Sequence, residues 1–147
     1  MERALVLSKY IVNKCINDQH PISNLQLQKI LYYIQKDSLQ RNDMIAFPDE
    51  IQAWRFGPVV PNSYYYFCGF AALPLTFRYE GVEADIAPAD RVAIDNIVEE
   101  KRQLMPWVLV KGTHVPGGAW DTAYNNGAGN GCPITAEMIK KEIAERL

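Results

Sequence analysis

Few side chains in this 147-residue sequence have the type and spacing that catalysis or metal binding requires. The first candidates are the two histidines, His20 and His114. His114 with Asp121 could supply an imidazole base and the carboxylate that orients it, as in a hydrolase. Such an enzyme also needs a nucleophile, and no serine or cysteine stands in a nucleophile-elbow pattern. Neither histidine lies at a metal-ligand spacing from another histidine or a paired cysteine. We therefore expect no metal site, and a small hydrolase using His114 and Asp121 is the least favoured functional hypothesis.

A glycine-rich run, residues 127–131, comes shortly before a predicted C-terminal helix and could be a phosphate-binding loop, because helix N-termini bind anions. However, no lysine followed by serine or threonine comes after the last glycine, and Pro133 lacks a backbone N–H. We expect a flexible turn at this run, and no nucleotide or other cofactor.

Composition and charge narrow the functional class further. The 15 Lys and Arg against 17 Asp and Glu leave a formal net charge of -2, which gives no electrostatic footprint for a nucleic acid. No stretch reaches the roughly 20 apolar residues that a membrane-spanning helix needs. Three widely spaced cysteines suit reduced thiols better than a disulfide framework. We expect a cytoplasmic protein with a single domain over residues 1–147, and neither a nucleic acid nor a membrane as partner.

Aromatic side chains are concentrated around one turn. The sequence Trp-Arg-Phe at residues 54–56 precedes Gly57–Pro58, and three consecutive tyrosines, residues 64–66, follow on a predicted short helix. Neighbours on a helix are about 100° apart around its axis, so the three rings cannot all point into a core. Tyr, Trp and Arg dominate the energetics of protein interfaces. The cluster therefore predicts a surface that contacts another macromolecule.

Helical periodicity predicts the elements that position this cluster. We expect a largely buried helix over residues 4–17, a second from residue 24 to at least 37, a short one over 62–68, one over 89–105 and a last one after Thr135. Ser23 and Gln26 form a capping-box pattern at the start of the second helix. The polar residues of that helix are expected on the side away from the core: Gln28, Lys29, Gln35 and Lys36.

Alternating apolar residues predict the extended segments. Residues 75–79 and 82–86 alternate on either side of Glu80–Gly81, which is typical of a two-stranded hairpin with one apolar face. Residues 44–60 are expected to hold a short extended segment and a tight turn, and residues 112–131 a long irregular connection. Since a hairpin is not stable alone, it must pack on the helices. The predicted class is α+β, mainly α-helical: a compact helical bundle with a small β-hairpin appendage.

Three blocks of this sequence resemble one known family. They are residues 25–33 (LQLQKILYY), residues 51–61 (IQAWRFGPVVP) with Tyr64, and Thr113–His114 with Ala119–Trp120. In this order they resemble the motifs of the Panacea domain, found in SocA-like antitoxins and GepA-type phage-associated proteins. The blocks extend over most of the chain, so together they are specific.

The resemblance implies a bacterial or prophage antitoxin without catalytic residues, which neutralises a toxin by direct protein contact. In some relatives the domain is an adaptor that hands the toxin to a Clp-type protease, so the implied partners are a cognate toxin and such a protease. A phage counter-defence or host-takeover protein that binds a host protein is the alternative. The resemblance assigns scaffold positions to Leu27, Lys29, Leu31, Tyr32, Trp54, Gly57, Pro58, Tyr64 and Thr113.

We expect the toxin-binding patch to lie on the rigid turn of the second block. Gly57 permits a backbone angle closed to other residues, Pro58 stiffens the chain, and the two could be clamped by flanking rings. A rigid surface loses little entropy on binding. The residues predicted to contact the partner are Arg55, Phe56, Tyr65, Tyr66, His114 and Trp120.

Overall fold

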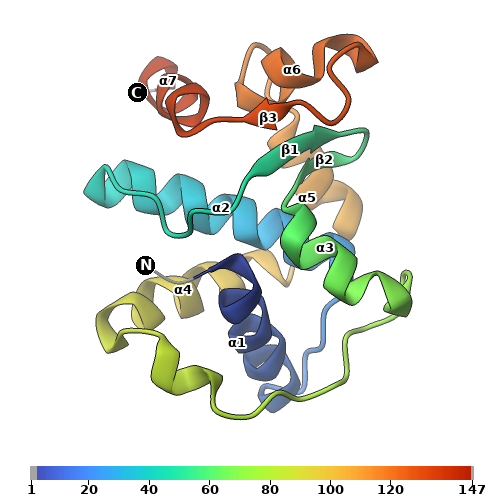
Figure 1. The fold of residues 1–147 in the computed structure, drawn as a ribbon, viewed down its shortest axis with the longest axis vertical. Coiled ribbons are helices and arrows are strands. Elements are labelled where there is room, and N and C mark those ends of the chain that lie inside the picture. Colours follow the sequence, from blue (N-terminus) through green and yellow to red (C-terminus); the bar gives the residue numbers. More distant parts are fainter. Residues whose placement is uncertain (1–2, 147) are drawn as a thin grey trace.

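The computed structural model describes residues 3–146, and in this range seven α-helices accompany a small sheet (Figure 1). The sheet is antiparallel with strand order β2-β1-β3, so the predicted α+β, mainly helical class is confirmed. No described helix is long and apolar enough to cross a membrane. The elements are α1 Ala4–Asn17, α2 Asn24–Asn42, β1 Ile51–Trp54, β2 Gly57–Val59, α3 Pro61–Phe67, α4 Pro88–Lys101, α5 Pro106–Thr113, α6 Ala119–Tyr124, β3 Pro133–Ile134 and α7 Ala136–Glu145, with 3₁₀ helices η1 Cys68–Phe70, η2 Val82–Asp85 and η3 Asn125–Gly127.

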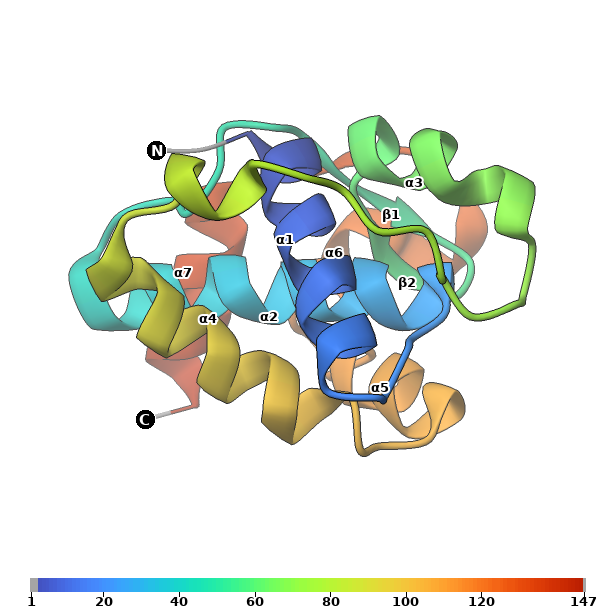
Figure 2. The ribbon, with the colours of Figure 1, turned by 90° about the horizontal axis from the view of Figure 1, so that it is seen from below.

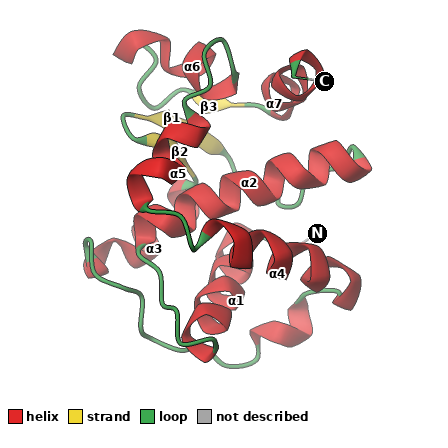
Figure 3. Cartoon of the chain, turned by 180° about the vertical axis from the view of Figure 1, so that it is seen from behind, coloured by secondary structure: helices red, strands yellow, loops and turns green. Residues whose placement is uncertain are grey.

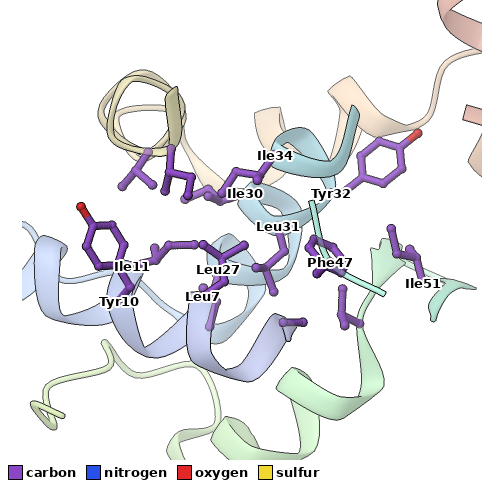
Figure 4. Packing of buried hydrophobic residues seen from close by; sticks show 14 of the residues in the cluster. Leu7, Tyr10, Ile11, Leu27, Ile30, Leu31, Tyr32, Ile34, Phe47 and Ile51 are labelled. Carbon is purple, nitrogen blue, oxygen red and sulfur yellow. The ribbon is translucent and has the colours of Figure 1, made fainter. Parts of the chain in front are cut away.

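Helix α2 runs through the middle of the molecule, with α1 and α4 on one side and the sheet, α6 and α7 on the other (Figures 1 and 3). Viewed from below, α1 crosses in front of α2, and α4 lies beside α2 (Figure 2). The apolar residues Leu27 and Leu31 of α2 are fully buried and lie beside Leu7 and Ile11 of α1 (Figure 4). These contacts belong to one core that includes residues from α1, α2, α3, α4, α6 and α7.

Local start signals hold where they were predicted. The capping box at α2 is confirmed, because the Gln26 N–H donates to Ser23 Oγ at 3.3 Å and the Ser23 N–H donates to Gln26 Oε1 at 2.9 Å. Thr135 Oγ accepts the Met138 N–H at 3.2 Å and caps α7. Such bonds satisfy N–H groups that the first turn of a helix leaves free.

The predicted hairpin over residues 75–79 and 82–86 is wrong. Residues 74–79 have no regular structure, and residues 82–85 form η2. The Leu75 N–H donates to the Ile22 carbonyl at 2.7 Å, and the Tyr79 N–H donates to Asn13 Oδ1 at 2.8 Å. In a hairpin, backbone N–H groups such as these would bond the partner strand. Here they bond α1 and the turn before α2 instead. The hairpin of the molecule is β1–β2, in the segment predicted as extended with a tight turn, and Gln52 lies opposite Val59.

The predicted irregular connection over residues 112–131 is also wrong in part, since it contains the end of α5 and the whole of α6. Tertiary bonds order this segment. Glu142 of α7 accepts the Ala119 N–H at 2.9 Å and so satisfies the start of α6. At the other end, the Gly131 N–H donates to the Ala53 carbonyl of β1 at 2.7 Å. Both partners are remote in sequence, so local composition cannot indicate them.

The prediction that the polar residues of α2 face solvent is wrong for Gln28, Lys29 and Gln35, which are buried. Neighbouring elements surround the helix, so its polar side chains meet backbone groups rather than water. Gln35 donates to the Phe47 carbonyl at 3.0 Å, and Gln28 Oε1 accepts the Val60 N–H at 3.0 Å. A buried polar group is tolerated when it is hydrogen-bonded in this way.

Gln28 is the centre of a buried polar network that joins three helices. Its Nε2 donates to Ser63 Oγ of α3 at 3.1 Å and to Asn24 Oδ1 at 3.0 Å. Ser63 Oγ lies 2.8 Å from Ser8 Oγ of α1, and Asn24 Nδ2 donates to the Tyr64 carbonyl at 3.1 Å. The network therefore fixes the start of α3 relative to α1 and α2.

Replacing Gln28 with leucine should lower the free energy of unfolding by about 1–3 kcal/mol, because the buried Val60 N–H loses its partner and the Ser63 hydroxyl keeps only Ser8. Urea denaturation of the purified chain measures this change. The control is Gln40→Leu at an exposed position of the same helix, which should stay within about 0.5 kcal/mol of the parent. Equal stabilities for the two variants would contradict the role assigned to Gln28.

Candidate functional site

The turn of the β1–β2 hairpin fits against α2 and α5 only because Gly57 has no side chain. Its φ is +110°, in a region that other residues rarely adopt. A Cβ at this position would lie 2.8 Å from Thr113 Oγ1 and 3.0 Å from Lys29 Cε. Lys29, Gly57 and Thr113 belong to the first, second and third of the sequence blocks that resemble the family. The structure brings these three residues together.

Lys29 of α2 holds the turn of the β1–β2 hairpin in place. Its side chain is fully buried, and Nζ donates to the Pro58 carbonyl at 2.8 Å. Burial disfavours the ammonium form and lowers the pKa of Lys29 to about 7. At neutral pH a fraction of the chains therefore carries a neutral amine here, which still donates to the carbonyl.

The hairpin and α3 together carry a group of packed rings. Trp54 and Tyr64 lie edge to face with centroids 4.9 Å apart, and the Tyr65 ring is 5.9 Å from Trp54 and 5.4 Å from Tyr64. Tyr65 is 62% exposed and Phe56 is 60% exposed. The Arg55 guanidinium carbon lies 5.4 Å from the Phe56 ring centre. Arg55, Phe56 and Tyr65 thus form an exposed surface on a packed base, which we call the hairpin surface.

A cavity of about 550 Å³ opens beside the hairpin surface and is lined in part by it. This volume falls in the range of about 300–1,000 Å³ that is usual for sites that enclose a ligand. Its walls come from α2, the hairpin, α3, η1 with the turn after it, and the turn before β3: Asn24, Leu25, Gln28, Lys29, Trp54, Arg55, Phe56, Val59, Tyr64, Tyr65, Cys68, Ala71, Ala72 and Asn130.

Trp120 and His114 lie behind the hairpin, not on the hairpin surface. Trp120 is buried, and its Nε1 donates to the Trp54 carbonyl at 2.8 Å. The His114 ring stacks on Trp120 with centroids 3.6 Å apart and planes 3° apart. Burial lowers the pKa of His114, the charge of Lys29 lowers it further, and Asp121 raises it. The imidazole is thus a neutral ring at neutral pH that holds Trp120 in place.

Tyr66 belongs to a different group of rings. Its centroid lies 4.9 Å from that of Phe67 and 6.1 Å from that of Tyr79, and Lys9 Nζ is 4.9 Å from the Tyr66 ring centre. Tyr66 does not line the cavity beside Tyr65. Of the six residues predicted to contact a partner, the structure places three together on the hairpin surface: Arg55, Phe56 and Tyr65.

The geometry does not form the base-and-carboxylate pair of a hydrolase. Asp121 Oδ2 accepts the Gly117 N–H at 2.8 Å, and within residues 3–146 no hydrogen bond joins it to His114. His114 Nε2 is buried and has no hydrogen-bond partner in the same range. No group of three metal-binding side chains occurs among the described residues.

Sequence reasoning missed the contribution of Gln28 to this site. The signal was present in the block LQLQKILYY, where two adjacent polar residues, Gln28 and Lys29, interrupt an apolar helix. Polarity alone predicted solvent exposure for both. A buried helix with polar groups inside its apolar run instead indicates backbone partners on a neighbouring element.

Replacing Gly57 with alanine should destabilise the protein strongly, by about 1–3 kcal/mol from backbone strain and by a further 1–3 kcal/mol or so from the close contacts with Thr113 and Lys29. The matched control is Gly127→Ala, because Gly127 has a similar φ of +101° but no neighbour closer than 3.9 Å to an added Cβ. Thermal unfolding of both variants separates the two contributions. Equal losses would show that the close fit against Thr113 and Lys29 contributes nothing.

Lys29 should make stability depend on pH. Its pKa is about 7 in the folded chain and about 10.4 in the unfolded chain. Between these values the unfolded chain binds more protons, so the free energy of unfolding rises with pH, by up to about 1.4 kcal/mol per unit. Urea denaturation from about pH 7 to about pH 9.5 should show this rise in the parent and a flatter profile in Lys29→Met.

The control for this measurement is Lys141→Met, which removes an exposed lysine of α7 and should keep the slope of the parent. An unchanged slope in Lys29→Met would contradict the lowered pKa. The window ends near pH 9.5 because tyrosines of the unfolded chain are half ionised at about pH 10, whereas burial raises the pKa of Tyr32 in the folded chain.

Comparison with known proteins agrees with the resemblance drawn from the three blocks. The family model described as "Antitoxin SocA-like, Panacea domain" matches residues 27–121. The chain is also similar to the protein named Antitoxin SocA of Caulobacter vibrioides (strain NA1000 / CB15N), with 27% identity over 156 residues that cover 98% of this chain and 81% of that protein. No solved structure matches significantly. The matched range includes Lys29, Gly57 and Trp120, and the chain belongs to the SocA-like antitoxin family, which is defined by its Panacea domain.

Proposed function

We propose that this chain is the antitoxin of a toxin–antitoxin pair, and that it neutralises the toxin by binding it directly through the hairpin surface. The observation that carries the proposal is the exposure of two large rings, Phe56 and Tyr65, on a hairpin that buried bonds hold in place. Family membership supports the antitoxin role, and the geometry supports the choice of surface.

Energetics favour this surface as a binding site. Covering apolar area gives about 25 cal/mol per Å², and Tyr and Arg are enriched among the residues that dominate binding energies. The bonds from Lys29 to Pro58 and from Trp120 to Trp54 hold the hairpin before any partner arrives. Binding therefore requires little ordering of the backbone, which favours affinity.

The other predicted contact residues receive different roles in this proposal. His114 and Trp120 support the hairpin from behind, because Trp120 is buried and bonded to the Trp54 carbonyl. Tyr66 is 48% exposed on the adjacent face of α3 and extends the contact area. The chain itself performs no bond-making chemistry, and it acts in the cytoplasm.

Delivery of the toxin to a Clp-type protease would need a second surface that stays free in the toxin complex. Exposed rings outside the hairpin surface include Trp107 of α5 and Phe77 in the loop before η2, which are 62% and 63% exposed. In the alternative within the family, a host protein occupies the hairpin surface in place of a toxin. Gene neighbourhood distinguishes the two, since the antitoxin requires a toxic reading frame next to its own.

Replacing both Phe56 and Tyr65 with alanine should weaken binding of the neighbouring gene's toxic product by about 30-fold or more, which corresponds to about 2 kcal/mol. Co-expression in bacteria should show loss of growth rescue, and co-purification should show loss of the complex. The matched control is Trp107→Ala, which removes an equally exposed ring from α5 and should still co-purify with the toxin like the parent. If the double variant still rescues growth and unfolds at the parent's temperature, the hairpin surface is not the toxin-binding site.

A further inference from the structure

The charges around the cavity beside Tyr65 are all of one sign. Two of the lining residues, Lys29 and Arg55, are basic, and no Asp or Glu lines it. Residues 51–79, which form the hairpin, α3 and η1, contain no acidic residue, although the chain has 17. Within residues 3–146, Arg55 takes part in no ion pair. The site therefore offers an unneutralised guanidinium at its mouth.

The remaining walls of the cavity are largely apolar. The rings of Trp54, Phe56 and Tyr65 line it, and Leu25 and Val59 contribute aliphatic surface. Asn130 adds an amide from the turn before β3. A ligand that fits both the apolar walls and the basic charge has an apolar body with an anionic group close to it.

We propose that the cavity receives an acidic segment of the partner toxin in which a large apolar side chain stands next to an aspartate or glutamate. This inference rests on the proposed function. The apolar side chain packs between the rings and Val59, and the carboxylate pairs with the Arg55 guanidinium. Arginine suits this role because its planar fork bonds both oxygens of a carboxylate while the stem packs on a ring.

A protein segment fits the surroundings better than a small anion or a nucleic acid. Phe56 and Tyr65 line the cavity and are 60% and 62% exposed, so a partner larger than a small anion can pack on both rings while part of it enters the cavity. A nucleic acid needs several cations along its phosphates. Lys29 is fully buried, so Arg55 is the one basic residue of the cavity lining that can reach an outside partner.

Affinity measurements on the full chain with the purified toxin from the neighbouring gene test this inference. The parent complex should weaken as salt rises from about 50 mM to about 300 mM, because a charge pair at the rim of an interface is screened. Arg55→Glu should weaken binding by about tenfold or more at low salt, chiefly through slower association, and Arg55→Lys should bind with intermediate affinity.

The matched control for charge is Lys141→Glu on α7, which makes the same change in net charge at an exposed position outside the cavity. It should bind the toxin within about twofold of the parent, since long-range effects of one exposed charge are screened. Thermal unfolding of both variants shows that the fold is retained.

A charge swap identifies the segment itself. Each toxin Asp or Glu that adjoins a large apolar residue is changed to lysine in turn, and one of these changes should weaken binding to the parent and restore binding to Arg55→Glu. Such reciprocal rescue arises only from a direct pair.

The outcomes separate this inference from the proposed function. If the parent chain forms no complex with the toxin, both fall. If the complex forms but Arg55→Glu binds as tightly as Lys141→Glu, the toxin-binding role stands and the acidic segment is overturned. A loss in Arg55→Glu that no charge swap restores overturns the acidic segment as well.

Discussion

The hydrogen bond from the buried Lys29 amine to the Pro58 carbonyl fixes the turn of the hairpin against α2, and the arrangement of the site follows from it. An amine that is shut off from water must find an acceptor, and the hairpin turn provides one. Gly57 permits the approach, because any side chain there would collide with Lys29 and Thr113. Three blocks that lie far apart in the sequence therefore meet at one point, and their relative positions are fixed by geometry rather than by apolar packing alone.

Further hydrogen bonds connect the hairpin to α3 and α6. Gln28 bonds the Val60 N–H and the Ser63 hydroxyl, so the start of α3 follows the hairpin. Trp120 bonds the Trp54 carbonyl from the opposite side. The result is a hairpin that is held from two directions and that carries exposed rings on a fixed base.

The features of the fold and the site that arise from neighbouring residues could be predicted from the sequence. Those that arise from contacts between distant segments could not. Helix starts were predictable at Ser23 and Thr135, because a cap involves residues three positions apart. The hairpin predicted around Glu80–Gly81 failed because Ile22 and Asn13 bind the backbone of that segment from afar. The burial of Gln28 and Lys29 was hidden, since polarity predicts exposure when the bonding partners are unknown. The hairpin surface was visible as a run of aromatic residues, but which rings share a cavity depended on the packing of α3.

Hydrogen–deuterium exchange of the chain, free and bound to the toxin of the neighbouring gene, shows whether the partner covers a surface that was already ordered. We predict slow exchange in β1 and β2 of the free chain, and added protection on binding that is concentrated at the hairpin tip and in α3. Exchange in α4, which contributes nothing to the cavity lining, should stay unchanged. Fast exchange of the hairpin in the free chain, or protection that falls on α4 and spares residues 54–67, would show that the hairpin is not an ordered binding surface.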